Sequence, residues 1–156
     1  MVKLKEFTKD RTGAKVQTHV TLSLLNIHDL PNILSWCREQ YDTWNYQWDW
    51  GVHGYQNCLP HFNIVDNPSH LHMRNLPEKE KQKIYLMLEQ QHDIFNNAGL
   101  PDWEQWAVDG IKSLKNIISQ DPTEGEWEQF IDNTKASDKF RKISIHDYIP
   151  WVGEYF

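Results

Sequence analysis

The sequence predicts an α+β fold with partial α/β character: one β–α unit and two short strands, followed by three helices that pack on a small sheet. Strict alternation of apolar and polar side chains over residues 15–24 indicates the first strand. After Pro77, apolar residues recur at the three- and four-residue spacing of amphipathic helices. With 156 residues and 39% hydrophobic content, the chain can bury the core of one domain, so residues 1–156 are expected to form a single domain.

Two helices are predicted around the first strand. Residues 2–12 form the first, which Gly13 ends. Its start carries no Ser, Thr, Asp or Asn cap, as expected either of a cut through a longer chain or of a frayed native terminus. After the strand, Asp29 can cap a helix that has Pro31 in its first turn and continues to about Tyr41. Strand, turn and helix form a β–α unit, the building block of parallel α/β structure.

The polar face of this strand carries the first candidate ligand-binding residues. His19, Thr21 and Ser23 share that face, and Asn26 follows the strand. In a barrel or partial barrel these side chains would line the interior, with Asn26 at the C-terminal mouth where the active sites of such folds gather. If the sheet has a solvent side, the same side chains are simply hydrated. The sequence leaves both interpretations open.

Aromatic residues are concentrated in residues 41–55, among Asn, Asp and Gly. No helical or strand period fits this segment, which predicts an ordered loop whose rings pack on the domain. The alternative is a stacking platform for a sugar, a base or another planar ligand, with Trp48 and Trp50 as candidate contacts.

Three histidines are the candidate metal ligands. Residues 59–65 and 70–75 look like two short strands separated by a turn. His70 and His72 would then point to one face of the second strand, and His61 on the neighbouring strand could face them. Three imidazoles could hold zinc or iron with an open coordination position. Alternation also places two polar residues on one face without any metal, and the sequence contains no HExxH motif.

The C-terminal half is predicted to form three amphipathic helices and a packed tail. Pro77 opens the first helix, and capping boxes at Asp102 and Thr123 open the second and third. The positions expected on the buried faces are Ile84, Leu88, Gln91 and Phe95; Trp103, Trp106, Ala107, Ile111, Leu114 and Ile118; and Trp127, Phe130, Ile131 and Phe140. Charged residues such as Lys81 are expected to form solvated faces. The tail, residues 144–156, is apolar enough to pack back on the domain.

Composition excludes several classes of function. A formal charge of −6 and the absence of any block of Lys and Arg argue against nucleic-acid binding, which needs clustered cations. No run approaches the ~18 apolar residues of a membrane span, and the N-terminus lacks the apolar region of a signal peptide. The expected location is cytoplasmic, where Cys37 and Cys58 would be reduced thiols. Cys37 is expected to be inert packing, whereas Cys58 near His53 and His61 is a conceivable nucleophile.

Several short motifs carry a resemblance to a known family. They are residues 21–27, 62–65, 67–71 and 75–77, with the closing set Phe130, Thr134, Asp138, Arg141, Ser144, Asp147 and Pro150. Through these motifs the chain, over residues 2–150, resembles the C-terminal part of phage-associated and marine bacterial radical SAM proteins with a twitch-type tail.

The resemblance implies that the chain is related to this family but lacks the part that binds the cofactor. In that family an N-terminal barrel region supplies a CxxxCxxC triad, which ligates a [4Fe–4S] cluster and leaves one iron open to S-adenosylmethionine. Such a cluster needs about four thiolates, or three with an open site, and Cys37 and Cys58 cannot supply them. We therefore expect no cofactor in this chain, and a gene fragment or stand-alone derivative that is not an enzyme by itself. In the intact family its polar strand face would flank the substrate cavity, and its helices would cap the barrel.

Two further expectations concern partners. A truncated parallel sheet would expose a strand edge and an apolar face, which predicts a homo-oligomer. The alternative function is a small ligand- or metal-binding module, with a small molecule or peptide bound by residues 44–55 or by the histidine face of His61, His70 and His72.

Overall fold

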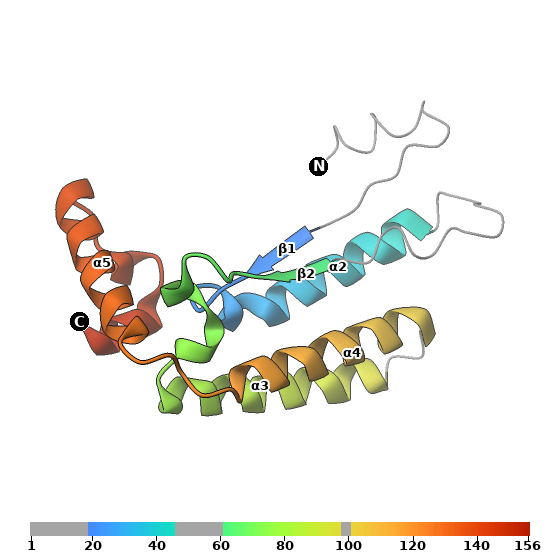
Figure 1. The fold of residues 1–156 in the computed structure, drawn as a ribbon. Helices are drawn as coiled ribbons and strands as arrows, with labels where there is room; N and C mark the ends of the chain where they lie inside the picture. The colour runs from blue at the N-terminus through green and yellow to red at the C-terminus, as the bar shows by residue number, and fades with distance from the viewer. Residues whose placement is uncertain (1–18, 46–60, 98–100) are drawn as a thin grey trace.

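The computed structural model describes residues 19–45, 61–97 and 101–156, and Figure 1 shows their arrangement. A small sheet and three long helices form the body, and a fourth helix with the C-terminal turns lies at one end (Figure 1). The predicted α+β class is confirmed. The predicted helix over residues 2–12, the aromatic segment with Trp48 and Trp50, and Cys58 lie outside the described residues.

The two strands and the helix between them form a parallel β–α–β unit. Strand β1, His19–Leu22, pairs in register with β2, His61–Ile64. The 3-10 turn η1, Ile27–Asp29, leads from β1 into helix α2, Leu30–Asn45. The helix therefore extends past Tyr41, where the sequence predicted the start of a loop. Parallel pairing requires a crossover connection of this kind, and α2 supplies it.

Side chains alternate across β1 as predicted. Leu22 is fully buried and Val20 partly buried, whereas His19 and Thr21 on the opposite face are exposed. Ser23 departs from the predicted polar face because the chain has left the strand there and turns toward η1, so its side chain is buried.

The strand predicted over residues 70–75 is wrong. The structure has two successive 3-10 turns in this segment, η3 (Ser69–Leu71) and η4 (Met73–Asn75). His72 Nδ1 accepts a hydrogen bond from the Arg74 backbone N–H at 3.0 Å. The Asn75 amide donates to the carbonyl of residue 69 at 2.8 Å. Side chains that bond nearby backbone groups compete with strand pairing in this way.

Helices α3, Glu78–Asn96, and α4, Pro101–Ile118, pack side by side, and Figure 1 shows the pair on one side of the sheet and α2. Their predicted apolar stripes are confirmed wherever burial is described, except that Gln91 is half-exposed. The buried members are Ile84, Leu88, Phe95, Ala107, Ile111, Leu114 and Ile118. Helix α4 approaches β2 closely at Gly110, where an added Cβ atom would lie 3.2 Å from the Phe62 ring.

The starts of the last two helices differ from the predicted capping boxes. Helix α4 begins at Pro101, ahead of the predicted cap Asp102. Helix α5, Glu126–Arg141, begins after Gly125, whose φ of 78° lies in the left-handed region that glycine adopts without strain. The predicted cap Thr123 is therefore wrong: it lies outside the helix and contributes only its backbone carbonyl to the first N–H of α5.

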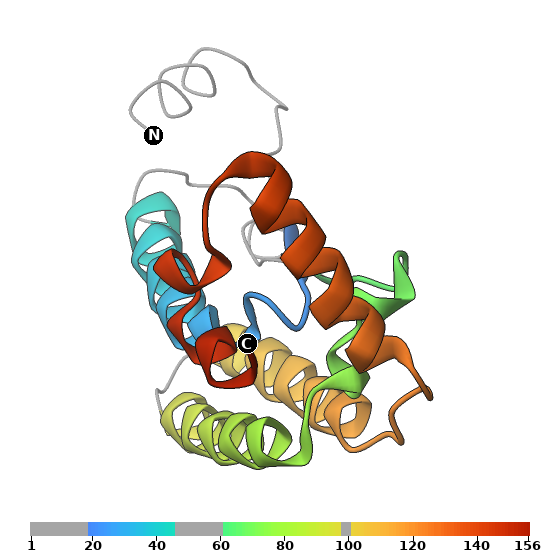
Figure 2. The same cartoon turned by 90° about the vertical axis from the view of Figure 1, so that its left-hand side faces the viewer.

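The C-terminal tail packs back on the domain, as predicted. It forms two 3-10 turns, η5 (Ile145–Asp147) and η6 (Pro150–Tyr155), and Val152 in η6 is fully buried. In Figure 2 these turns run back beside α5. Phe130 of α5 is buried, but Phe140 is 87% exposed, so its predicted inward position is wrong.

One connected apolar core joins these elements. Leu22 from β1, Leu34 from α2, Ile84 from α3 and Ile111 from α4 are all fully buried in it. Within the three described ranges, no helix combines the length and apolarity needed to cross a bilayer.

Candidate functional site

The exposed sheet face brings two of the predicted ligand-binding residues together. His19 and Thr21 are exposed side by side on β1. Asn63, opposite Thr21 on β2, is also exposed, and its Nδ2 lies 3.4 Å from His19 Nδ1. We call these three residues the polar sheet face. It offers amide, hydroxyl and imidazole groups to anything that covers the sheet from this side.

Ser23 and Asn26 do not join the polar sheet face. Asn26 Oδ1 accepts a hydrogen bond from the Ser23 backbone N–H at 2.8 Å. The Asn26 amide donates to the Thr21 carbonyl at 2.9 Å. Both residues therefore shape the turn that follows β1, where Asn favours such local bonds. The other predicted ligand contacts, Trp48 and Trp50, fall outside the described residues.

Two of the three candidate metal ligands have separate partners. His72 is buried, its Nδ1 accepts from the Arg74 N–H, and its Nε2 lies 3.3 Å from Asp66 Oδ1. Burial lowers the pKa of His72, so the ring is neutral with its hydrogen on Nε2. His70 instead reaches Asn133, with 3.4 Å between His70 Nε2 and Asn133 Nδ2. Among described residues, no group of three His, Cys, Asp or Glu side chains is placed to hold a metal, and the His61 side chain is not described.

Cys37 has the inert environment that the sequence predicted. Cys37 on α2 is 4% exposed, and burial raises the pKa of its thiol to about 11. A thiol with this pKa is protonated at neutral pH and is a poor nucleophile.

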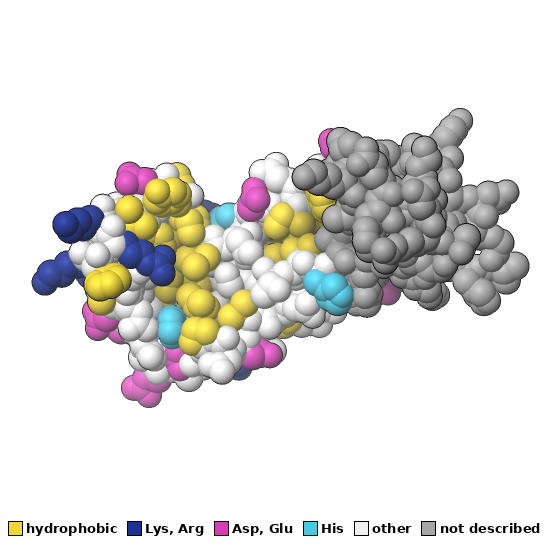
Figure 3. Space-filling model, turned by 90° about the horizontal axis from the view of Figure 1, so that it is seen from above, with side chains coloured by type: hydrophobic (Ala, Val, Ile, Leu, Met, Phe, Trp, Pro, Cys, Tyr) yellow, Lys and Arg dark blue, Asp and Glu magenta, His cyan; other side chains and the backbone are white. Residues whose placement is uncertain are grey.

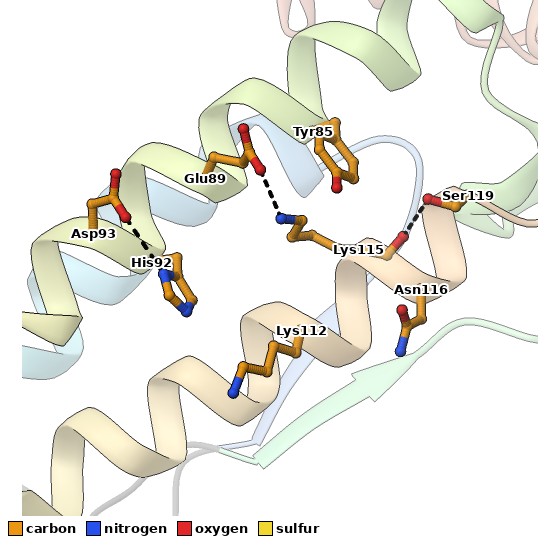
Figure 4. Close-up of a pocket in the computed structure, with 8 residues that line it drawn as sticks. All are labelled: Tyr85, Glu89, His92, Asp93, Lys112, Lys115, Asn116 and Ser119. Atoms are coloured by element: carbon orange, nitrogen blue, oxygen red, sulfur yellow. Dashed lines mark hydrogen bonds and ion pairs between the residues drawn. The ribbon is translucent and has the colours of Figure 1, made fainter.

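A groove of about 510 Å³ runs between α3 and α4 (Figure 4). Lys115 Nζ donates to Glu89 Oε1 at 2.9 Å and lies 4.4 Å from the centroid of the Tyr85 ring. Figure 4 shows these side chains turned toward each other across the groove. Ligand pockets are mainly apolar with a few polar groups, whereas this groove is lined by charges that neutralise each other. We interpret it as a solvated seam between the helices.

A buried carboxylate lies where the C-terminal turn η6 meets the start of α3. Glu80 is 0% exposed. Its Oε1 accepts from Lys83 Nζ at 2.7 Å and from the Tyr155 hydroxyl at 3.1 Å. Its Oε2 lies 3.5 Å from His28 Nε2, and neither of these two buried atoms forms a hydrogen bond. The His28 ring stacks against Trp151 with 4.7 Å between centroids. We call these five residues the Glu80 cluster.

Electrostatics in the Glu80 cluster favour a neutral imidazole beside a carboxylate. Burial lowers the pKa of His28, the Glu80 carboxylate opposes that shift, and the Lys83 ammonium adds to it. Burial and the nearby Glu80 raise the pKa of Tyr155 to about 12, so its hydroxyl remains a hydrogen-bond donor. Because Glu80 is at the N-terminal turn of α3, the helix dipole also stabilises its charge. The arrangement can hold a proton donor, an acceptor and a cation in place, and its direct effect is to tie η1, α3 and η6 together.

The sequence interpretation missed this cluster. It assigned the charged start of α3 to a solvated face, yet Glu80 and Lys81 are both buried. Lys81 Nζ donates to the Gln120 carbonyl just beyond the end of α4. The available signal was helical spacing, because Glu80 and Lys81 precede Ile84 and Leu88 on the same stripe.

The chain matches no family model, no curated protein and no solved structure.

Proposed function

We propose that this chain completes a larger α/β sheet of the radical SAM type and contributes to the wall of its substrate cavity, without carrying the cofactor. The observation that supports this most strongly is the polar sheet face. Parallel sheets normally have both faces covered. Here one face packs on the core through Leu22, whereas His19, Thr21 and Asn63 on the other face are exposed.

The edges of the sheet support the same proposal. In the part of the chain that the structure describes, the sheet consists of β1 and β2 alone, so each strand has one edge without a partner strand. A two-stranded sheet is marginal by itself, and open edges recruit further strands. Strands of a larger barrel would fill these positions.

The proposed segment is not a catalyst alone. The chain has two cysteines, fewer than a [4Fe–4S] cluster needs, and Cys37 is buried and protonated. The cluster and S-adenosylmethionine would be held by the part that carries a CxxxCxxC triad. This chain would supply the polar sheet face beside the substrate.

Co-expression with a polypeptide that carries the CxxxCxxC triad and the preceding barrel strands tests the proposal. We expect a one-to-one complex that cleaves S-adenosylmethionine reductively, and no cleavage by the chain alone. Thr21→Lys should weaken the complex at least about tenfold, because covering the sheet would bury an unpaired ammonium. Ser35→Lys, a matched change at an exposed position of α2, should leave it intact. Failure to form a complex, or stoichiometric iron and cleavage activity in the chain alone, would overturn the proposal.

A ligand-binding module is the second candidate, supported by the adjacent His19 and Asn63 side chains on the exposed sheet. A thermal-shift screen against sugars, nucleotides and divalent metals tests it, because a specific ligand raises the melting temperature by mass action. This candidate requires a rise that Asn63→Ala removes. A flat response across the screen would count against it.

A further inference from the structure

Helix α5 carries an ordered stripe of charges on its outer face. Glu128, Asp132, Lys135 and Lys139 are all exposed, and their spacing of four, three and four residues places them on one side of the helix. We call these four residues the α5 stripe. Two acidic residues thus lie toward the N-terminal half of the helix and two basic residues toward the C-terminal half. Seen from above, Lys and Arg side chains gather at the end of the molecule that holds α5 (Figure 3).

Three of the four side chains of the α5 stripe form no hydrogen bond, ion pair or ring contact with another described residue, whereas Lys135 Nζ lies 5.5 Å from the centroid of the Phe156 ring. None of the four side chains in the stripe forms an ion pair with another described residue. Glu128 and Asp132 are like charges four residues apart, as are Lys135 and Lys139, and such pairs disfavour a helix. The helix dipole favours Glu128 in the first turn and Lys139 in the last. The dipole does not extend to Asp132 and Lys135 in the middle turns: Lys135 lies over the Phe156 ring, and Asp132 has no ion-pair partner among the described residues.

The order of the charges makes the α5 stripe complementary to an antiparallel second copy of itself. If a second copy of α5 lies antiparallel, with a two-fold axis between positions 133 and 134, Glu128 faces Lys139 of the second copy. The same axis places Asp132 opposite Lys135 of the second copy. Each like-charged pair along one helix then meets an opposite-charged pair across the interface, and the symmetry forms every contact twice.

An exposed apolar side chain flanks the α5 stripe at the end of the helix. Phe140 is 87% exposed, directly after Lys139, and Ala136 between the two lysines is also exposed. If the second copy covers part of the Phe140 ring, the buried apolar surface stabilises a contact whose register is set by the charges.

We propose that two copies of this chain pair through their α5 stripes, antiparallel about this two-fold axis. Helix α5 has 16 residues and is about 24 Å long, so the contact is smaller than a standard interface of about 800 Å² per partner. The pair is therefore weak and depends on salt. This surface is separate from the sheet edges, so the proposal goes beyond the sheet-completing function and does not rest on it.

Sedimentation velocity of the full chain at high concentration tests the pairing. The parent chain forms a dimer at low ionic strength, and about 0.5 M NaCl dissociates it because exposed charges are then screened. Glu128→Lys/Asp132→Lys and Lys135→Glu/Lys139→Glu should each be monomeric. An equimolar mixture of the two variants should restore a dimer, because one stripe is then fully basic and the other fully acidic.

The variant with all four reversals is the matched control. It keeps the parent's net charge and restores complementarity, so it should dimerise as the parent does. Thr21→Lys leaves α5 unchanged and should also dimerise, which separates this proposal from pairing through the sheet. Circular dichroism confirms that each variant is folded. A monomeric mixture, or a dimer that persists in both double variants, would overturn the proposal.

Discussion

His28 Nε2 faces Glu80 Oε2 at 3.5 Å, inside the junction that joins the C-terminal turn to the start of α3. Neither atom has a hydrogen-bond partner, although the other carboxylate oxygen of Glu80 accepts from Lys83 and Tyr155. Tyr155 lies 75 residues from Glu80 in the sequence, so this contact fixes the end of the chain to the body. The Glu80 cluster therefore stabilises the fold and makes its stability sensitive to pH.

Replacing Glu80 should be costly. Glu80→Ala removes the acceptor for Lys83 and Tyr155 and is expected to lower the free energy of unfolding by about 2–4 kcal/mol, as for other broken buried pairs. Glu78→Ala, an exposed change in the same helical turn, should cost less than about 0.5 kcal/mol. Urea unfolding of both variants measures the difference. Equal costs would show that the cluster contributes nothing beyond the helix start.

Stability should fall as the pH drops through the ordinary histidine range. Burial lowers the pKa of His28 and of His72 in the folded state, so the unfolded chain binds more protons below pH ~6.5. Their contribution is complete above that pH and is lost as the pH falls toward the folded pKa values.

Unfolding free energies measured between about pH 8 and pH 5 check this direction. The variant His28→Gln/His72→Asn should show a shallower decline, and the Asn keeps an acceptor for the Arg74 N–H. A decline as steep as in the parent would assign the pH dependence to other groups.

Cys37 should resist alkylation. In a Cys58→Ser background, Cys37 is the remaining thiol, and burial raises its pKa to about 11. Its reaction with iodoacetamide near neutral pH should be at least about 100-fold slower than in denaturant. In the folded chain little of the thiol is ionised, and the reagent cannot reach the buried sulfur. Mass spectrometry of timed samples measures the ratio. Native labelling as fast as in denaturant would mean that α2 does not remain packed.

Gly110 should tolerate no large side chain. A Cβ atom there would already lie 3.2 Å from Phe62, so Gly110→Leu is expected to destabilise the fold by about 1–3 kcal/mol through overpacking between α4 and β2. Phe62→Ala should recover part of that loss in the double variant, although it is itself destabilising. A thermodynamic cycle of the four proteins measures this coupling. Additive effects would contradict the close approach of α4 to the sheet.

Local periodicity predicted the parts of the fold that depend on neighbouring residues. The alternation of Val20 and Leu22 predicted β1, and the stripe of Ile84, Leu88 and Phe95 predicted the buried face of α3. The parallel pairing itself depends on a partner strand far along the chain. The resemblance and the β–α unit suggested α/β structure but gave no register.

The predictions from the sequence were wrong where tertiary contacts determine the local structure. The 70–75 segment has polar residues that look alternating, but Asn75 bonds to the carbonyl of residue 69 and to the Thr123 N–H, and this holds two turns in place. Phe140 fits an apolar spacing on α5, yet the helix end carries it away from the core. The Glu80 cluster was not predicted because its partners come from three separate segments.

Hydrogen exchange of the strand amides is the most direct measurement of the sheet-completing role. In the chain alone, the outer-edge amides of His19–Leu22 and His61–Ile64 should exchange rapidly, since the described sheet leaves one edge of each strand unpaired. With the triad-carrying polypeptide bound, we predict slow exchange in both strands and unchanged exchange in α5. Rapid strand exchange in a complex that still cleaves S-adenosylmethionine would contradict the account.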